Sequence, residues 1–85
     1  MLPSERATEV VNQRQGQYGH PGPIYKRWID MVNLIEGTHI PHEHGALLLI
    51  LLKIAREYSN PYEDNITDIA GYANVYEMVK EYLHG

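Results

Sequence analysis

Apolar residues recur along this chain with the spacing of helices, and nowhere do they alternate as in strands. The strongest run covers residues 46–52, ALLLILL, within a helix predicted over residues 43–58. A helix that is apolar all round has to be enclosed by other elements on every side. The pattern therefore predicts an all-α fold organised around this run.

Two helices are predicted before the central one. The first covers residues 4–15, with Ser4 as its N-cap and Gly16 at its end. The second covers residues 23–36 and ends at Gly37. Its apolar residues have spacings of four, three and four, which predicts a stripe that faces the core. That stripe consists of Ile24, Trp28, Met31 and Ile35.

A fourth helix is predicted after a short turn. Asn60, Pro61 and Glu63 fit an N-cap, a first-turn proline and a capping-box acid, with Asp64 as a competing start. The helix is expected to reach Leu83 and to pack against the third as an antiparallel hairpin, because the turn between them is short. Its expected core side consists of Ile66, Ile69, Ala70, Ala73, Tyr76 and Leu83.

The length of the chain limits how much core it can build. Eighty-five residues form a single domain over residues 1–85, and a domain of that size buries only a little over roughly 60% of its unfolded surface. The chain contains no cysteine, so disulfides cannot reinforce it. We therefore expect oligomerisation, as a homodimer or higher, to complete the helical bundle.

The net charge and the lack of apolar targeting segments limit the kinds of protein that we expect this chain to be. The net charge of −4 argues against a nucleic-acid or anionic-membrane binder, because both need a basic face. No apolar run approaches the roughly 18 residues of a membrane-spanning helix. The N-terminus reaches Glu5 and Arg6 without the apolar segment of a signal peptide. These features favour a cytoplasmic protein.

Four charged residues flank the predicted hairpin turn. Lys53 and Arg56 precede it, and Asp64 and Asp68 follow it four residues apart, on one face of the fourth helix. The hairpin would bring all four together. One interpretation is an ion-pair latch that fixes the hairpin. The other is a site in which the aspartates hold a divalent ion, or orient the bases, while the bases contact a phosphate.

Other side chains admit a functional and a structural interpretation. Tyr18 and Arg27 could supply a stacking ring and a bidentate phosphate donor to a nucleotide pocket, or a packed loop aromatic and an exposed arginine. The histidines between the second and third helices match no helical metal pair, so we expect them to be solvated. They are His39, His42 and His44. The chain offers no serine triad and no phosphate-binding glycine loop.

Several motifs together resemble a family of small phage and prophage proteins of unknown function. They are Tyr18-Gly19-x-Pro21, then Tyr25 and Arg27, LLKIAR at residues 51–56, Asp64, and DIAGYA at residues 68–73. Members of that family follow a pattern like YGDP…F.R…W, LLK.AR and D…DIAGY. The chain departs from it at His20, where an acid is usual, and in PHEHG at residues 41–45.

That family is in turn remotely similar to the all-α MazG-type nucleoside triphosphate pyrophosphohydrolases, which bind magnesium through EExxE and ExxD motifs. Asp64 and Asp68 resemble the second motif, whereas leucines, Lys53 and Arg56 stand where the first would supply glutamates. The resemblance implies a MazG-like bundle that binds or hydrolyses nucleotides, with Mg²⁺ at the aspartates. It leaves enzymatic activity open. The alternative is a non-enzymatic protein-interaction module with the four charges as a latch.

Overall fold

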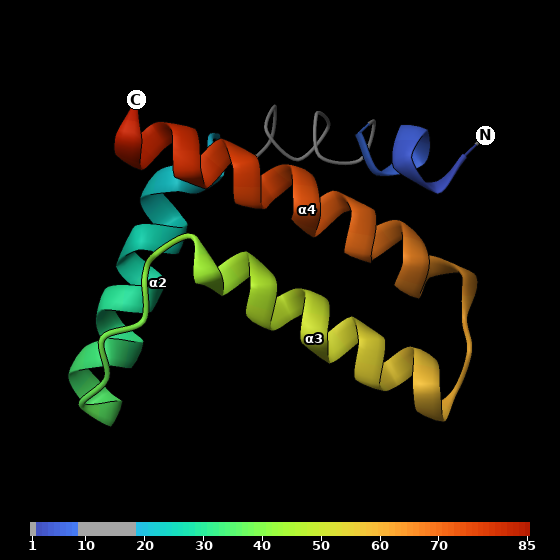
Figure 1. Ribbon diagram of the computed structural model, residues 1–85, viewed down its shortest axis with the longest axis horizontal. Coiled ribbons are helices and arrows are strands. Elements are labelled where there is room, and N and C mark those ends of the chain that lie inside the picture. The colour runs from blue at the N-terminus through green and yellow to red at the C-terminus, as the bar shows by residue number, and fades with distance from the viewer. Residues whose placement is uncertain (1, 9–18) are drawn as a thin grey trace.

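The computed structural model describes residues 2–8 and 19–85, and every regular element in those residues is helical. The helices are α2 (Pro21–Glu36), α3 (His44–Ser59) and α4 (Glu63–His84), and residues 3–8 are also helical (Figure 1). The all-α prediction is confirmed. Residues 9–15 of the first expected helix lie outside the described residues. None of the described helices is long and apolar enough to cross a membrane.

An antiparallel hairpin of α3 and α4 forms the body of the molecule, as the sequence predicted (Figure 1). Helix α2 crosses one end of the hairpin, and the helical residues 3–8 lie on the side of α4 opposite α3. There, Arg6 holds the segment to α4, because its Nε donates a hydrogen bond of 2.9 Å to Thr67 Oγ1 and its guanidinium pairs with Glu63. The hairpin thus carries a helix at one end and a short helical segment along one side.

The core of the described residues is small. Its centre is Ala46, Val75 and Val79, where α3 meets α4. Among the described residues, Ile29 and Val79 are the largest fully buried side chains. A core of this size leaves a single chain with little hydrophobic stabilisation.

The stripe predicted to face the core on α2 is on the wrong side of the helix. Ile24 and Met31 are more than half exposed and Ile35 is 74% exposed, whereas Ile29 is fully buried. Helix α2 packs across the hairpin through the side that carries Gly22 and Ile29. The 4-3-4 spacing identified an apolar side of the helix, but the side that meets the hairpin is the one where glycine allows close approach. Three members of the apolar stripe are left at the surface, and only Trp28 packs inward, against Gly45 of α3.

The central run also lacks the enclosure that its composition requires. Of residues 46–52, only Ala46 is buried, because α4 covers one side of α3 and the opposite side faces solvent. The helices of residues 2–8 and 19–85 therefore leave most of this run uncovered.

Helix α4 begins and packs differently from the prediction. Its N-cap is Tyr62, and Asn60 instead ends α3 by donating its backbone N–H to Arg56 O at 2.8 Å. Val75 and Val79 form the centre of the packing against α3; of the expected core side, Tyr76 and Leu83 pack against them, whereas Ile66 and Ala73 are exposed. A turn of three residues separates the helices, so the N-cap falls two residues after Asn60.

Side-chain hydrogen bonds fix the connection between α2 and α3. Gly37 ends α2 with a φ of +66°, a conformation that favours glycine. Asn33 then holds the returning chain, because its Oδ1 accepts from Thr38 Oγ1 and from the backbone N–H of Ile40, and its Nδ2 donates to Ile40 O. This connection sets where α3 begins relative to α2.

Gly45 of α3 packs closely against Trp28 and Ile29 of α2, and it provides a test of this packing. In Gly45→Ala, the new Cβ would lie 2.7 Å from Trp28 Cζ3 and 3.2 Å from Ile29 Cδ1. We expect a loss of about 1–3 kcal/mol in the free energy of unfolding, measured by urea denaturation, because the added methyl group overpacks the contact. In a Trp28→Leu background the same substitution should cost less. An equal cost in both backgrounds would contradict the assigned packing.

Candidate functional site

The α3–α4 turn is closed by a carboxylate that the sequence reasoning missed. Glu57 Oε1 accepts hydrogen bonds from the backbone N–H of Tyr62 at 3.0 Å and from Asn65 Nδ2 at 3.1 Å. It thereby satisfies one of the donors at the N-terminus of α4, and Asn65 is buried. A glutamate in the last turn of a helix opposes the helix dipole, so its position was a signal that a specific partner follows.

One of the predicted ion pairs, Lys53 with Asp68, forms about two helical turns from the α3–α4 connection. Lys53 Nζ lies 2.7 Å from Asp68 Oδ2, and the two side chains are 17% and 28% exposed. Lys53 extends from α3 and Asp68 from α4, so the pair joins the two helices of the hairpin. Its partial burial makes the attraction stronger than that of a surface pair and makes either charge costly to leave alone.

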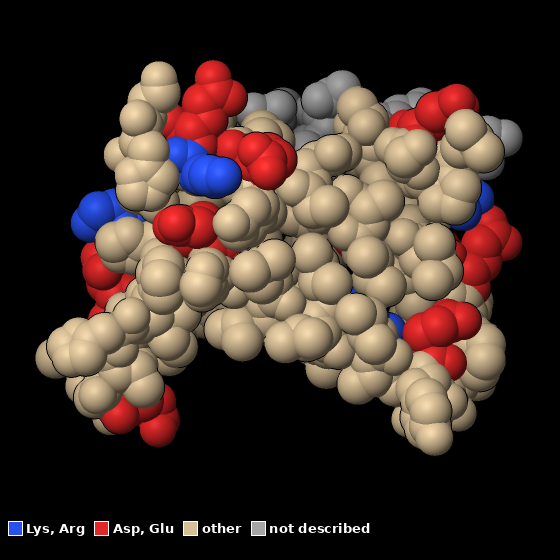
Figure 2. Space-filling model, in the orientation of Figure 1, with Lys and Arg blue, Asp and Glu red and all other residues tan. Residues whose placement is uncertain are grey.

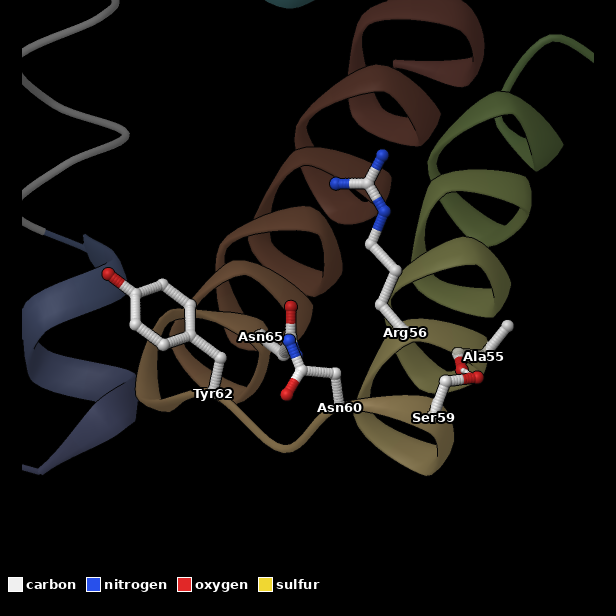
Figure 3. Close-up of a pocket in the computed structure, with 6 residues that line it drawn as sticks. All are labelled: Ala55, Arg56, Ser59, Asn60, Tyr62 and Asn65. Atoms are coloured by element: carbon white, nitrogen blue, oxygen red, sulfur yellow. Dashed lines mark hydrogen bonds between the residues drawn. The ribbon is translucent and has the colours of Figure 1, made fainter.

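Arg56 and Asp64 do not join that pair. Both are exposed, and neither has an ion pair with any described residue. Arg56 instead lines a shallow depression of about 440 Å³ beside the turn (Figure 3). In Figure 3 the Asn60 and Asn65 amides lie near the base of the Arg56 side chain, and the Tyr62 ring points away from it. The full lining is Ala55, Arg56, Ser59, Asn60, Tyr62 and Asn65.

Arg27 lies at the other end of the hairpin. It lines a second depression of about 450 Å³ with residues of α2 and with Tyr82 of α4. Tyr82 and Tyr62 are separated by almost the whole of α4, about 30 Å of helix. A single chain therefore does not bring Arg27 and Arg56 into one pocket. Tyr18, the other residue assigned to that pocket, lies outside the described residues.

Two charged residues of α2, Lys26 and Asp30, line the second depression, and His42 of the α2–α3 connection contacts Asp30. Asp30 accepts a hydrogen bond from His42 at 2.6 Å and pairs with Lys26 at 3.2 Å. The hydrogen bond from His42, with that from Lys26, lowers the pKa of the Asp30 carboxyl. The contact ties the α2–α3 connection to α2. His39 and His44 are exposed, as the sequence predicted for this group, whereas His42 is partly buried against Asp30.

The described residues hold no group of three or more histidine, aspartate or glutamate side chains that could hold a metal ion. Asp68 is engaged by Lys53, and Asp64 is one helical turn away on the exposed surface. Magnesium binding at these two aspartates stays a prediction.

An exposed apolar surface runs along α3, and we call it the α3 face. Its members are Leu47, Leu48, Leu51, Leu52, Ile54 and Tyr58. Leu51 is 60% exposed and Tyr58 is 93% exposed. Figure 2 shows uncharged surface across the middle of the molecule, where α3 runs in Figure 1, with most charged residues toward the two ends. Contiguous apolar surfaces of this kind mark interaction sites.

Comparison with known proteins places the chain in a family. The "Domain of unknown function (DUF6378)" matches residues 4–80. The chain belongs to this family. It is 38% identical over 77 residues to the Gene 55 protein of Mycobacterium phage L5, and 37% identical over 82 residues to the Gene 55 protein of Mycobacterium phage D29.

Coverage limits what these relatives imply. The matches cover 87% and 91% of this chain but 49% and 52% of the two Gene 55 proteins, so the chain spans about half their length. No solved structure matches the chain. The comparisons confirm the predicted resemblance to phage proteins of unknown function, and the more remote likeness to MazG-type enzymes stays a prediction.

The two aspartates differ in their surroundings, and this predicts different effects on stability. Asp68→Asn should lower the free energy of unfolding by about 1–3 kcal/mol, because it leaves the partly buried Lys53 charge without its partner. Asp64→Asn is the matched control and should change it by less than about 0.5 kcal/mol. Urea denaturation of both variants measures the difference. A change below about 0.5 kcal/mol for Asp68→Asn would contradict a structural role for the ion pair.

Proposed function

We propose that this protein is a helical association module, whose α3 face binds an apolar surface of another protein chain. The observation that carries the proposal is the arrangement of α3. Its charged residues Lys53 and Glu57 are engaged with α4, while its leucines face outward. The polar groups that would normally cover the outside of a surface helix are used inside the hairpin.

The energetic argument supports association. Each large aliphatic side chain gains about 1.5–3 kcal/mol on full burial relative to full exposure, and five aliphatic members of the α3 face remain between 37% and 60% exposed. Only Ile29 and Val79 are large, fully buried side chains among the described residues. Burial of the five aliphatic side chains of the α3 face would therefore add more buried apolar area than Ile29 and Val79 now contribute.

Position-specific photo-crosslinking in bacterial cells that express the chain tests this proposal. A photoreactive benzoylphenylalanine at Ile54, on the α3 face, should crosslink to one defined protein chain, which mass spectrometry then identifies. The same residue at Glu5 is the matched control, because Glu5 is exposed on the opposite side of α4. Equal crosslinking at both positions, or none at Ile54, would overturn the proposal.

The Arg56 depression supports a second candidate function, the binding of a nucleotide. Arg56 has no ion pair with any described residue, and the depression around it offers amide and hydroxyl groups from Asn60, Asn65 and Ser59. An unpaired guanidinium is a suitable donor for a phosphate. In this proposal Arg56 contacts phosphate, and Lys53 and the two aspartates support it with or without Mg²⁺. Nucleotide hydrolysis of the MazG type is the enzymatic form of this proposal.

A thermal-shift series with nucleoside triphosphates, with and without Mg²⁺, tests the second candidate. A ligand at about tenfold its Kd should stabilise the fold by about 1.4 kcal/mol and raise the Tm by several degrees. Arg56→Gln should abolish the rise, whereas Arg27→Gln, at the other end of the hairpin, should retain it. No shift for any nucleotide would overturn this candidate. Release of pyrophosphate would distinguish hydrolysis from binding.

A further inference from the structure

We infer that the chain that covers the α3 face is a second copy of this protein, packed antiparallel about a two-fold axis, with Leu47 of one copy against the partner's Tyr58. The inference rests on the proposed association through the α3 face and names its partner. It follows from the charge, the spacing and the extent of that face.

The charge of the α3 face selects the chemistry of its partner. Between Leu47 and Ala55 its outward positions carry no ionisable group, because Lys53 is directed to Asp68. Arg56 borders the face, four residues after Leu52. A partner surface with buried charges would lose hydration without gaining an ion pair. The α3 face is itself an uncharged apolar surface and therefore matches a second copy of itself.

The spacing of the face permits an antiparallel copy to pack in register. One row of the face is Leu47, Leu51, Ile54 and Tyr58, at intervals of four, three and four. This order of intervals is the same in both directions. An antiparallel copy therefore places Leu47 against the partner's Tyr58 and Leu51 against the partner's Ile54.

A two-fold axis also suits the charges of the helix ends. An antiparallel arrangement sets the N-terminal end of each α3 beside the C-terminal end of the other, so the helix dipoles attract, whereas a parallel pair would place like ends together. The two copies use the same surface, which is the isologous contact of most homodimers. The contact is then closed and does not extend into a filament.

The extent of the face fits a stable dimer. A standard interface takes roughly 800 Å² from each partner, and a fully buried aromatic side chain alone contributes about 150–250 Å². The α3 face offers five aliphatic side chains and Tyr58. Partial exposure of these groups adds up to an area on the order of that standard. A second copy supplies this cover wherever the chain itself is made.

Cysteine pairing tests the partner and its direction together. The chain has no cysteine, so a single introduced thiol reports one position. We expect a mixture of the Leu47→Cys and Tyr58→Cys proteins to form a disulfide-linked heterodimer under mild oxidation. Each protein alone should form little, because an antiparallel pair separates its two identical positions by eleven residues of helix, about 16 Å along the axis, and a disulfide requires Cα atoms within about 7 Å.

Matched controls distinguish disulfides formed by specific packing from those formed by random collision or by misfolded variants. Leu34→Cys, on a highly exposed site of α2, mixed with Tyr58→Cys gives the rate of random collision. Circular dichroism of each variant, compared with the unchanged chain, confirms that it is folded. Tyr58 is almost fully exposed, so its replacement leaves the packing of the single chain intact.

The outcomes distinguish this inference from the proposed association. Preferential linkage of Leu47→Cys to Tyr58→Cys, together with a dimeric mass by light scattering for the unchanged chain, supports the second copy. Self-linkage of Tyr58→Cys as fast as the mixed reaction overturns the antiparallel packing. A monomeric mass at tens of micromolar overturns the second copy. If crosslinking at Ile54 then identifies a different protein, the proposed association remains and only its partner changes.

Discussion

The packing of α3 is the constraint on which the rest of the structure depends. Its central run, residues 46–52, is apolar all round, yet α4 covers one side of the helix and only Ala46 of the run is buried. Helix α2 and the residues 3–8 lie at the end and on the far side of the hairpin, so neither runs along the side of α3 that faces away from α4 (Figure 1). The described fold therefore leaves the most apolar segment of the chain at its surface.

On α3, two charged residues face the neighbouring helix and the leucines face solvent, which reverses the usual arrangement of a surface helix. Glu57 closes the turn, and Lys53 joins α3 to Asp68 on α4. Such pairs add little net stability but oppose misaligned packing, because a shifted hairpin would leave a partly buried charge unpaired. The polar contacts thus determine how the two helices align. The apolar side, which α4 does not cover, remains available to drive association.

Parts of this arrangement could be predicted from the sequence. The helical elements and the hairpin followed from local signals, namely the apolar spacing and the short turn, although α4 begins later than Asn60 predicted. The ion pair of Lys53 and Asp68 followed because a hairpin brings these positions together. His20 was identified as a departure from the family pattern, and the structure shows that its Nδ1 accepts from the backbone N–H of Gly22 at 2.9 Å. It thereby caps α2 as an aspartate would.

Other parts could not be predicted, because they depend on contacts between distant segments. Ile29 rather than Ile35 is buried on α2, since Gly45 of α3 allows Trp28 to approach. Arg56 did not join the ion pair of Lys53 and Asp68, so the expected cluster of four charges did not form. Arg27 lies about a helix length from Arg56, so the two arginines line separate depressions. Spacing along one helix identifies a face, but only the partner helix determines whether that face is buried.

The central claim is that the α3 face is covered by a second copy, and the dependence of stability on protein concentration tests it most directly. If two chains unfold together, a hundredfold dilution lowers the free energy available for folding by about 2.7 kcal/mol per dimer. The urea midpoint should then fall clearly between high and low concentration, and Leu51→Glu should remove this dependence. An identical midpoint across that range for the unchanged chain would contradict the account.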